Sequence, residues 1–148
     1  MIGIFTGSFD PYTIGHDDIL RRALPLFSRV VIGVGVNEHK KYMFSMKERC
    51  EAIARIYSDE TKVEVKEYSD LTVDFARREG ASYIIKGVRS IKDFEYEREQ
   101  AEINRQLTGI ETLLLFSDPR YSSLSSSVVR ELMHFGQDVS SFLPQPVK

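Results

Sequence analysis

Residues 1–36 read MIGIFTGSFDPYTIGHDDILRRALPLFSRVVIGVGV, and this stretch decides the fold. Residues 1–6 form a short apolar run that ends at Gly7, and residues 30–36 form a second run that is apolar on both faces. Residues 15–27, between the two runs, carry apolar side chains at helical spacing. A strand that is apolar on both faces is typical of the centre of a parallel sheet. The stretch therefore predicts a strand, a helix and a second strand parallel to the first.

The same alternation continues along the rest of the chain. Ser45 and Glu48 have the spacing of a capping box, which predicts the start of a helix that runs to about residue 57. Further strands are expected at residues 62–68, 82–86 and 111–116. The first of these is expected near a sheet edge, because charged residues alternate with its valines. Further helices, each followed by a glycine that can end a helix, are expected at residues 71–79, 92–107 and 125–135.

This order of elements predicts the fold class. Strands that alternate with helices through short connections form a doubly wound parallel sheet, because crossovers between parallel strands are right-handed. We therefore expect a Rossmann-like α/β fold with a five-stranded parallel sheet and helices on both of its faces. The length of 148 residues, without linkers or repeats, predicts a single domain over residues 1–148.

The composition limits the classes of function. Hydrophobic residues make up 42% and charged residues 28% of the chain, as is usual for globular proteins. A formal net charge of −2 provides no general attraction to nucleic acid or to an acidic membrane. We find no pattern of a signal peptide or membrane span, and the single cysteine, Cys50, excludes an internal disulfide. We expect a cytoplasmic protein that binds neither nucleic acid nor membrane.

The fold class also predicts where a ligand binds. In open α/β sheets, ligands bind beyond the carboxyl ends of the strands. The loops at that edge are expected at residues 7–16, 37–44, 68–71, 86–93 and 117–127. Polar or cationic groups suited to phosphate occur in these loops, so we expect an anionic ligand there.

The loop at residues 7–16 has the features of a phosphate site. Gly7 allows a tight turn, Ser8 supplies a hydroxyl, and Gly15 and His16 lie at the start of the next helix. A helix start presents unpaired N–H groups and the positive end of the helix dipole to an anion. His16 can then donate a hydrogen bond to a phosphate oxygen. The alternative is that His16 is an ordinary surface histidine after a turn.

Cations and hydroxyls follow three of the other predicted strands. They are Lys40 after the second strand, Lys86 and Arg89 after the fourth, and Ser125, Ser126 and Ser127 after the fifth. Each has a plainer interpretation, such as a solvated turn for Lys40 or a helix N-cap for the serines. Their convergence at one edge of the sheet predicts a nucleotide site. No cluster of His, Cys, Asp or Glu has metal-ligand spacing, so any metal is expected to arrive with the nucleotide.

A series of short motifs supports a resemblance to a known family. They are GSFDP at 7–11, TIGH at 13–16, KKYMF at 40–44, KGVR at 86–89, DFEYE at 93–97, LSSS at 124–127 and FLP at 142–144. As an ordered set these motifs resemble bacterial phosphopantetheine adenylyltransferases. That family belongs to the nucleotidyltransferase superfamily marked by a (His/Thr)-x-Gly-His motif.

The resemblance implies an activity, a cofactor and an assembly. The implied reaction converts ATP and 4′-phosphopantetheine to dephospho-coenzyme A and pyrophosphate, which is the penultimate step of coenzyme A biosynthesis. It implies Mg²⁺ bound with ATP, a homohexamer built as a dimer of trimers, and coenzyme A as a feedback ligand. The apolar pantetheine arm is expected against residues 68–73, which could instead be core at the start of a helix.

The resemblance also implies roles for individual residues. The implied catalytic residues are Ser8, which bridges ATP and the substrate phosphate, His16, which stabilises the phosphates, Lys40, which grips them, and Arg89. The implied ATP-binding residues are Ser8, Phe9, His16, Gly87, Val88, Arg89, Glu97, Tyr121, Ser122, Ser123, Leu124, Ser125, Ser126 and Ser127. The implied substrate-binding residues are Ser8, Lys40, Thr72 and Lys86.

Three positions depart from the residues usual in the family or superfamily. Ser8 replaces Thr but keeps the hydroxyl, and Lys86 replaces Arg, so a point charge stands where a bidentate fork is usual. Thr13 replaces the first His of the superfamily motif, as is common in this family.

Two classes of alternative are open. The first is a related transferase, such as a nicotinamide-nucleotide adenylyltransferase or a glycerol-phosphate cytidylyltransferase, which Thr13 and the LSSS and FLP motifs disfavour. The second is a non-catalytic nucleotide sensor on the same fold, which the presence of Ser8, His16, Lys40 and Arg89 disfavours.

Overall fold

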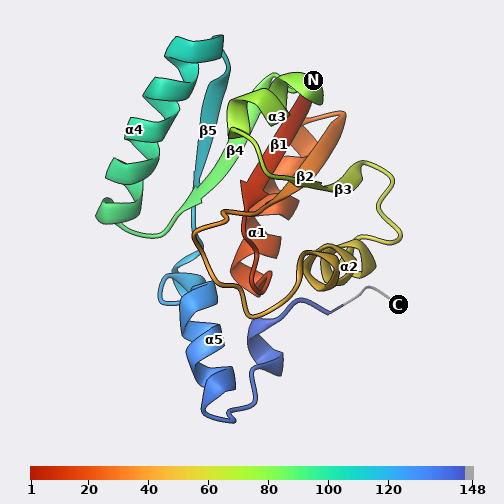
Figure 1. Cartoon of the computed structure of the whole chain (residues 1–148), viewed down its shortest axis with the longest axis vertical. Helices are drawn as coiled ribbons and strands as arrows, with labels where there is room; N and C mark the ends of the chain where they lie inside the picture. Colours follow the sequence, from red (N-terminus) through yellow and green to blue (C-terminus); the bar gives the residue numbers. More distant parts are fainter. Residues whose placement is uncertain (146–148) are drawn as a thin grey trace.

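The computed structural model describes residues 1–145, which contain a five-stranded parallel sheet in the order β3-β2-β1-β4-β5 (Figure 1). The strands are β1 (Ile2–Gly7), β2 (Arg29–Gly35), β3 (Val63–Tyr68), β4 (Tyr83–Val88) and β5 (Glu111–Phe116). The strand β1 is central. The strands β2 and β3 follow it on one side, and the chain then crosses to β4 and β5 on the other side of β1. This reversal of direction between β1 and β4 is the switch point at which open α/β sheets bind ligands.

Helices cover both faces of the sheet, as the sequence predicted. They are α1 (Ile14–Ala23), α2 (Met46–Ile56), α3 (Thr72–Arg78), α4 (Ile91–Thr108) and α5 (Ser126–His134). Leu20 of α1 and Ile53 of α2 share one core cluster with Phe5 and Ile85 of the sheet. On the other face α3 packs in a second cluster and also contacts α4. Figure 1 shows α5 beyond the carboxyl ends of the strands.

The glycine-containing strand β2 is packed closely, and the partner is a helix. Gly33 lies under Phe75 of α3, whose ring stacks on Tyr68 at a centroid distance of 4.5 Å. A Cβ atom at Gly33 would overlap the Phe75 ring and lie 3.1 Å from Cε1 of Tyr68. The absence of a side chain at Gly33 is therefore explained by the close approach of α3.

Most predicted element ends are confirmed by their capping interactions. Ser45 Oγ accepts a hydrogen bond from the Glu48 backbone N–H at 3.1 Å, which completes the predicted capping box. Gly80, Gly109 and Gly136, which follow predicted helices, have φ values of 70°, 76° and 76°. In this left-handed region a side chain is disfavoured, which explains the glycines.

Two predicted boundaries were wrong in ways that affect the site. The predicted helix over residues 15–27 ends at Ala23, and a 3₁₀ turn (Leu24–Leu26) follows, because Pro25 has no N–H to continue the α-helix. The predicted strand at residues 82–86 continues to Val88, since its pairing with β5 extends to Phe116. Lys86 therefore lies within β4 rather than after it.

We predict that Gly33→Ala lowers the free energy of unfolding by about 1–3 kcal/mol, because the added methyl group overpacks the interface with Phe75. Thermal and urea unfolding measure the change. Gly35→Ala is the matched control, since its Cβ would meet only Tyr68, at 3.2 Å or more, and its loss should be smaller. An equal loss in both variants would contradict this account of Gly33.

Candidate active site

A cavity of about 390 Å³ opens at the carboxyl ends of β1 and β4, where the switch point was expected. The first loop, the end of β4, the start of α4 and the segment before α5 all contribute to its wall. The predicted site residues that line it are Ser8, Phe9, His16, Lys40, Lys86, Gly87, Arg89, Glu97, Tyr121, Leu124, Ser125, Ser126 and Ser127. Segments far apart in the sequence thus meet at one cavity.

Four predicted site residues lie elsewhere. Val88 is buried in the sheet, and Ser122 and Ser123 are exposed outside the cavity lining. Thr72 begins α3, and its Oγ1 lies 3.1 Å from the hydroxyl oxygen of Tyr68, away from the cavity lining. Of the residues expected against the pantetheine arm, Val73 is core, so the plainer interpretation holds for that position.

His16 is oriented by the start of its own helix. Thr13 is the N-cap of α1, and its backbone N–H donates to His16 Nδ1 at 2.9 Å. In return the His16 backbone N–H donates to Thr13 Oγ1 at 3.4 Å, so the two residues form a reciprocal capping box. Because Nδ1 accepts a hydrogen bond, the proton of the neutral imidazole is on Nε2.

The surroundings of His16 keep it neutral. Burial lowers the pKa of His16 to about 4, and the positive charges of Arg89 and Lys86 act in the same direction. At neutral pH the imidazole is therefore an uncharged donor through Nε2. Its ring contacts Tyr12, stacked at 5.3 Å, and Phe9, nearly perpendicular at 5.0 Å. Phe9 is itself buried and has a φ of 48°, which reverses the backbone directly after Ser8.

The cations of the cavity differ in how they are held. Lys86 Nζ donates to the Thr6 carbonyl at 3.3 Å and lies 3.7 Å from Glu97 Oε2. Arg89 Nε lies 3.5 Å from Asp93 Oδ2. Lys40 is exposed, and within residues 1–145 no carboxylate pairs with it. Glu97, which was predicted to contact ATP, thus lies where it pairs with Lys86.

Sequence reasoning missed Asp10, which fixes the loop that carries Lys40. The Asp10 side chain is 2% exposed, and its two oxygens accept hydrogen bonds from the backbone N–H groups of Met43 at 2.8 Å and Phe44 at 2.9 Å. This ties the loop at residues 37–44 to the turn that carries Ser8. An aspartate before proline is an ordinary turn signal, so no local pattern could reveal a partner more than thirty positions away.

Arg49 makes a second connection between the same segments. Its buried guanidinium donates through Nη1 to the carbonyls of Ser8 at 2.7 Å and Gly35 at 3.1 Å. The same group lies 4.2 Å from the ring centroid of Tyr42. Tyr42 in turn accepts a hydrogen bond from the Asn37 N–H at 2.7 Å. The carbonyl of Ser8, the end of β2 and the Lys40 loop are therefore held as one unit.

Arg130 is a further cation of the cavity that the sequence analysis did not select. From α5 it donates through Nη1 to the Asp10 carbonyl at 2.8 Å and through Nη2 to Ser127 Oγ at 3.1 Å. Arg130 lies one helical turn after Ser126 in a predicted helix, so both side chains fall on the same helix face. This spacing could have predicted that Arg130 lies near the site.

The serine run supplies structural contacts as well as an anion-friendly helix start. Ser125 Oγ caps α5 by accepting from the Val128 N–H at 3.1 Å, and Ser126 Oγ donates to the Pro11 carbonyl at 2.8 Å. The plainer N-cap interpretation is therefore correct for the hydroxyl of Ser125. What the helix start offers a phosphate is its backbone N–H groups.

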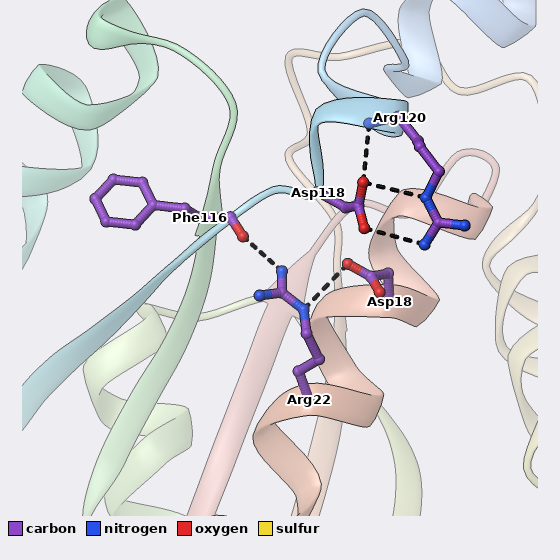
Figure 2. A network of polar contacts seen from close by, with 5 residues as sticks. All are labelled: Asp18, Arg22, Phe116, Asp118 and Arg120. Carbon is purple, nitrogen blue, oxygen red and sulfur yellow. Dashed lines mark hydrogen bonds and ion pairs between the residues drawn. The ribbon is translucent and has the colours of Figure 1, made fainter.

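The segment before α5 is fastened to α1 (Figure 2). Arg22 of α1 donates through Nη2 to the Phe116 carbonyl at 2.5 Å, and its Nε lies 3.1 Å from Asp18 Oδ2. Asp118 caps the following 3₁₀ turn (Pro119–Tyr121) and pairs with Arg120 at 3.0 Å. The same helix thus carries His16 at its start and holds the end of β5 near its last turn.

The chain has clear relatives among proteins of known family. A model of the cytidylyltransferase-like family matches residues 4–132. The phosphopantetheine adenylyltransferase of Phocaeicola vulgatus is 50% identical over 145 residues, which cover 98% of this chain and 96% of that protein. The protein of the same name from Porphyromonas gingivalis is 51% identical, with coverage of 97% and 94%.

Solved structures with the same fold are more distant in sequence. A putative nicotinate-nucleotide adenylyltransferase from Vibrio parahaemolyticus has a TM-score of 0.68 at 18% identity, covering 97% of this chain and 93% of that one. A bifunctional NMN adenylyltransferase/ADP ribose pyrophosphatase from Francisella tularensis has a TM-score of 0.73 at 16% identity, covering 99% of this chain and 45% of that one. These likenesses confirm the predicted Rossmann-like α/β fold.

We predict that an NMR pH titration of the His16 imidazole has its midpoint near pH 4. Because this pKa lies below the ordinary value of 6.5, the unfolded chain binds a proton that the folded chain does not, and stability falls as the pH drops from 6.5 toward 4. Arg89→Met should raise the midpoint, since it removes a like charge. Arg120→Met, which removes a charge already paired with Asp118, should leave it unchanged. A midpoint near 6.5 in the unmodified protein would contradict the proposed environment.

Proposed function

The chain belongs to the phosphopantetheine adenylyltransferases of the cytidylyltransferase-like family, and from this premise we propose its reaction and the residues that carry it. The enzyme transfers the adenylyl group of ATP to 4′-phosphopantetheine, giving dephospho-coenzyme A and pyrophosphate in the penultimate step of coenzyme A biosynthesis. The observation that supports this best is the single cavity that brings His16 together with Lys40, Lys86 and Arg89. A cavity lined by these three cations and a histidine suits two polyanionic substrates, because the positive charges offset their mutual repulsion.

We propose an in-line displacement without a covalent enzyme intermediate. An oxygen of the phosphopantetheine phosphate attacks the α-phosphorus of ATP, and the bond from that phosphorus to the β-phosphate oxygen breaks, releasing pyrophosphate. A phosphate monoester is largely ionised near neutral pH, because its second pKa is about 6, so it needs no general base. Catalysis then consists of alignment and neutralisation of charge.

His16 suits the role of a donor and not that of a base. Its Nδ1 lone pair is occupied by the Thr13 N–H, and its Nε2 carries the proton. Nε2–H can therefore donate to an oxygen on the transferring phosphate as negative charge develops there. Lys40, unpaired with any carboxylate in residues 1–145, and Arg89 neutralise the same charge, and Ser8 bridges donor and acceptor.

The remaining assignments follow the resemblance. We propose that ATP contacts Ser8, Phe9, His16, Gly87, Arg89, Glu97, Tyr121 and residues 124–127, which line the cavity. Contacts at Val88, Ser122 and Ser123, which the resemblance also implies, require the nucleotide to reach beyond the cavity lining. The substrate phosphate contacts Ser8, Lys40 and Lys86. A contact at Thr72 requires the pantetheine arm to extend beyond the cavity to the start of α3.

Mg²⁺ fits the site as a companion of the nucleotide. This ion usually keeps several waters and is bound through one or two carboxylates together with substrate phosphates. Asp93 and Glu97 line the cavity, but they already face Arg89 and Lys86. Within residues 1–145 no three His, Cys, Asp or Glu side chains are grouped to hold a metal alone. When bound with ATP, the ion would neutralise phosphate charge.

We further propose that the chain is a cytoplasmic homohexamer, a dimer of trimers, with coenzyme A as a feedback ligand. Support for self-association comes from α4, which has no buried residue although it is the longest helix among residues 1–145. Its exposed apolar side chains include Ile91, Phe94, Ile103 and Leu107, and Phe116 of the neighbouring edge strand is 73% exposed. A surface of this kind is typical of protein interfaces. No helix in the described part of the chain is long and apolar enough to cross a membrane.

The reaction is tested by ATP-dependent pyrophosphate release with 4′-phosphopantetheine as acceptor. We predict that His16→Ala and Lys40→Ala each lower turnover about 10²–10³-fold, because each removes a donor aimed at the transferring charge. Lys41→Ala is the matched control, since Lys41 adjoins Lys40 but does not line the cavity. Near-normal release by both site variants would refute the mechanism. Release with nicotinamide mononucleotide instead of 4′-phosphopantetheine would refute the substrate.

The assembly is tested by sedimentation. We predict that the unmodified protein sediments as six chains and that Ile103→Asp with Leu107→Asp dissociates the particle, because a charge then lies in an apolar interface on α4. Leu26→Asp, an equally exposed apolar residue on the 3₁₀ turn after α1, should leave the particle intact. Sedimentation of the unmodified protein as a single chain would rule out the hexamer.

A further inference from the structure

A buried chain of hydroxyl and carboxylate groups lies behind His16, and the proposed reaction does not use it. Tyr57 donates from its hydroxyl to Asp17 Oδ1 at 2.5 Å. The hydroxyl of Tyr12 lies 2.7 Å from that of Tyr57. Because Tyr57 gives its one proton to Asp17, Tyr12 is the donor in this second bond. Both tyrosines are buried, so the chain is fixed among packed groups.

The far end of the chain is also anchored. Asp17 is in the first turn of α1, where the helix dipole favours a carboxylate, and its other oxygen accepts from Arg21 Nε at 2.9 Å. The Arg21 guanidinium lies 5.3 Å from the ring centroid of Tyr57, which is the C-cap residue of α2. Tyr12 is thereby tied to two helices from the loop that precedes α1.

The near end of the chain is the Tyr12 ring, which stacks on His16 at 5.3 Å with an interplanar angle of 29°. The hydrogen bond from Thr13 fixes only one atom of the imidazole, Nδ1, and the ring can still tilt about that point. The stacked ring of Tyr12 and the nearly perpendicular ring of Phe9 restrict this tilt. The direction of Nε2–H therefore depends on where Tyr12 lies.

Tyr12 is held by its hydroxyl as well as by packing against neighbouring rings. The ring also borders a second, mostly apolar cavity of about 280 Å³, together with Phe44, Ile56 and Pro144. The hydroxyl bond to Tyr57 adds a directional restraint that fixes the Tyr12 ring at the wall of this cavity.

We propose that Tyr12 is a positioning residue for adenylyl transfer, with its ring setting the plane of His16 and Tyr57 and Asp17 setting the place of Tyr12. The proposal rests on the proposed role of His16 as donor to the transferring phosphate. Tyr12 itself touches no phosphate in this scheme. Its contribution is to kcat rather than to ATP affinity, because the cations and helix starts that bind the nucleotide are unchanged.

The test compares Tyr12→Leu, Tyr12→Phe and Tyr57→Phe in the pyrophosphate-release assay. Tyr12→Leu removes the stacked ring and should lower kcat about 10²-fold, since a misplacement of about 1 Å at a reacting group has an effect of that size. Tyr12→Phe and Tyr57→Phe keep the rings but break the anchor, and should give smaller losses in kcat with an unchanged KM for ATP. Phe27→Leu, a buried aromatic residue away from the cavity, is the control for lost volume.

A double-mutant cycle separates positioning from a structural role. If Tyr12 acts through His16, Tyr12→Leu should cause no further loss of kcat in a His16→Ala background. A full additional loss there, or an unchanged kcat in Tyr12→Leu alone, would overturn the proposal. A fall in melting temperature without a fall in kcat, as expected for Phe27→Leu, would likewise show that Tyr12 is only structural.

NMR of the His16 ring gives a readout that does not depend on turnover. Tyr12→Leu should raise the pKa of His16 from about 4, because water reaches the ring, and should reduce the Nε2–H shift change caused by ATP. If the unmodified protein shows that ATP-induced shift but transfers nothing to 4′-phosphopantetheine, the proposed function fails while the positioning role stands. If Tyr12→Leu changes neither quantity, the positioning role fails whatever the substrate.

Discussion

The reciprocal hydrogen bonds between Thr13 and His16 are the interaction on which both the start of α1 and the proposed role of His16 depend. They begin α1 by satisfying one N–H at its start and one at the residue before it. The same bond from the Thr13 N–H occupies Nδ1 of the imidazole and so leaves the proton on Nε2. A histidine in the N3 position of a capping box is therefore oriented, given its tautomer and placed at the positive end of a helix by one local arrangement. Threonine at position 13 is sufficient for this arrangement, so the orientation of His16 does not require a first histidine in the motif.

Electrostatics explains why a neutral histidine stands among cations. In the proposed reaction two polyanionic substrates repel one another, and the charges of Lys40, Lys86, Arg89 and Arg130, which line one cavity, offset that repulsion. The same positive field, together with burial, lowers the pKa of His16 to about 4. Carboxylates moderate this positive field, since Glu97 lies near Lys86 and Asp93 near Arg89. A bound phosphate competes with these carboxylates for the cations. Part of the free energy of phosphate binding therefore offsets the loss of ion pairs that the protein already contains.

The fold followed from the sequence because its signals are local. Apolar runs, the Ser45 capping box and the glycines at positions 80, 109 and 136 each act within a few residues, and the structure confirms them. The cavity could be placed for the same reason, since parallel strands end at one edge. The contacts that hold its parts together could not be predicted. Asp10 binds the backbone of residues 43 and 44, and Arg49 binds the Ser8 carbonyl, so each partner is brought near only by the finished fold. Family resemblance supplied roles for side chains, but it gave no indication of these connecting contacts.

These connecting contacts hold the first loop, which carries Ser8, and the loop that carries Lys40 as one unit. Asp10 holds the backbone near the end of the Lys40 loop, and Arg49 joins the carbonyl of Ser8 to the end of β2. Lys40 itself is exposed, yet the loop that carries it is fixed at its start by Tyr42 and Asn37 and at its end by Asp10. A transfer between two phosphates requires that groups on the donor and acceptor sides keep a constant separation. In the proposed reaction that separation is set by partly buried hydrogen bonds to backbone atoms, so the exposed Lys40 side chain can follow the phosphate while its backbone stays in place.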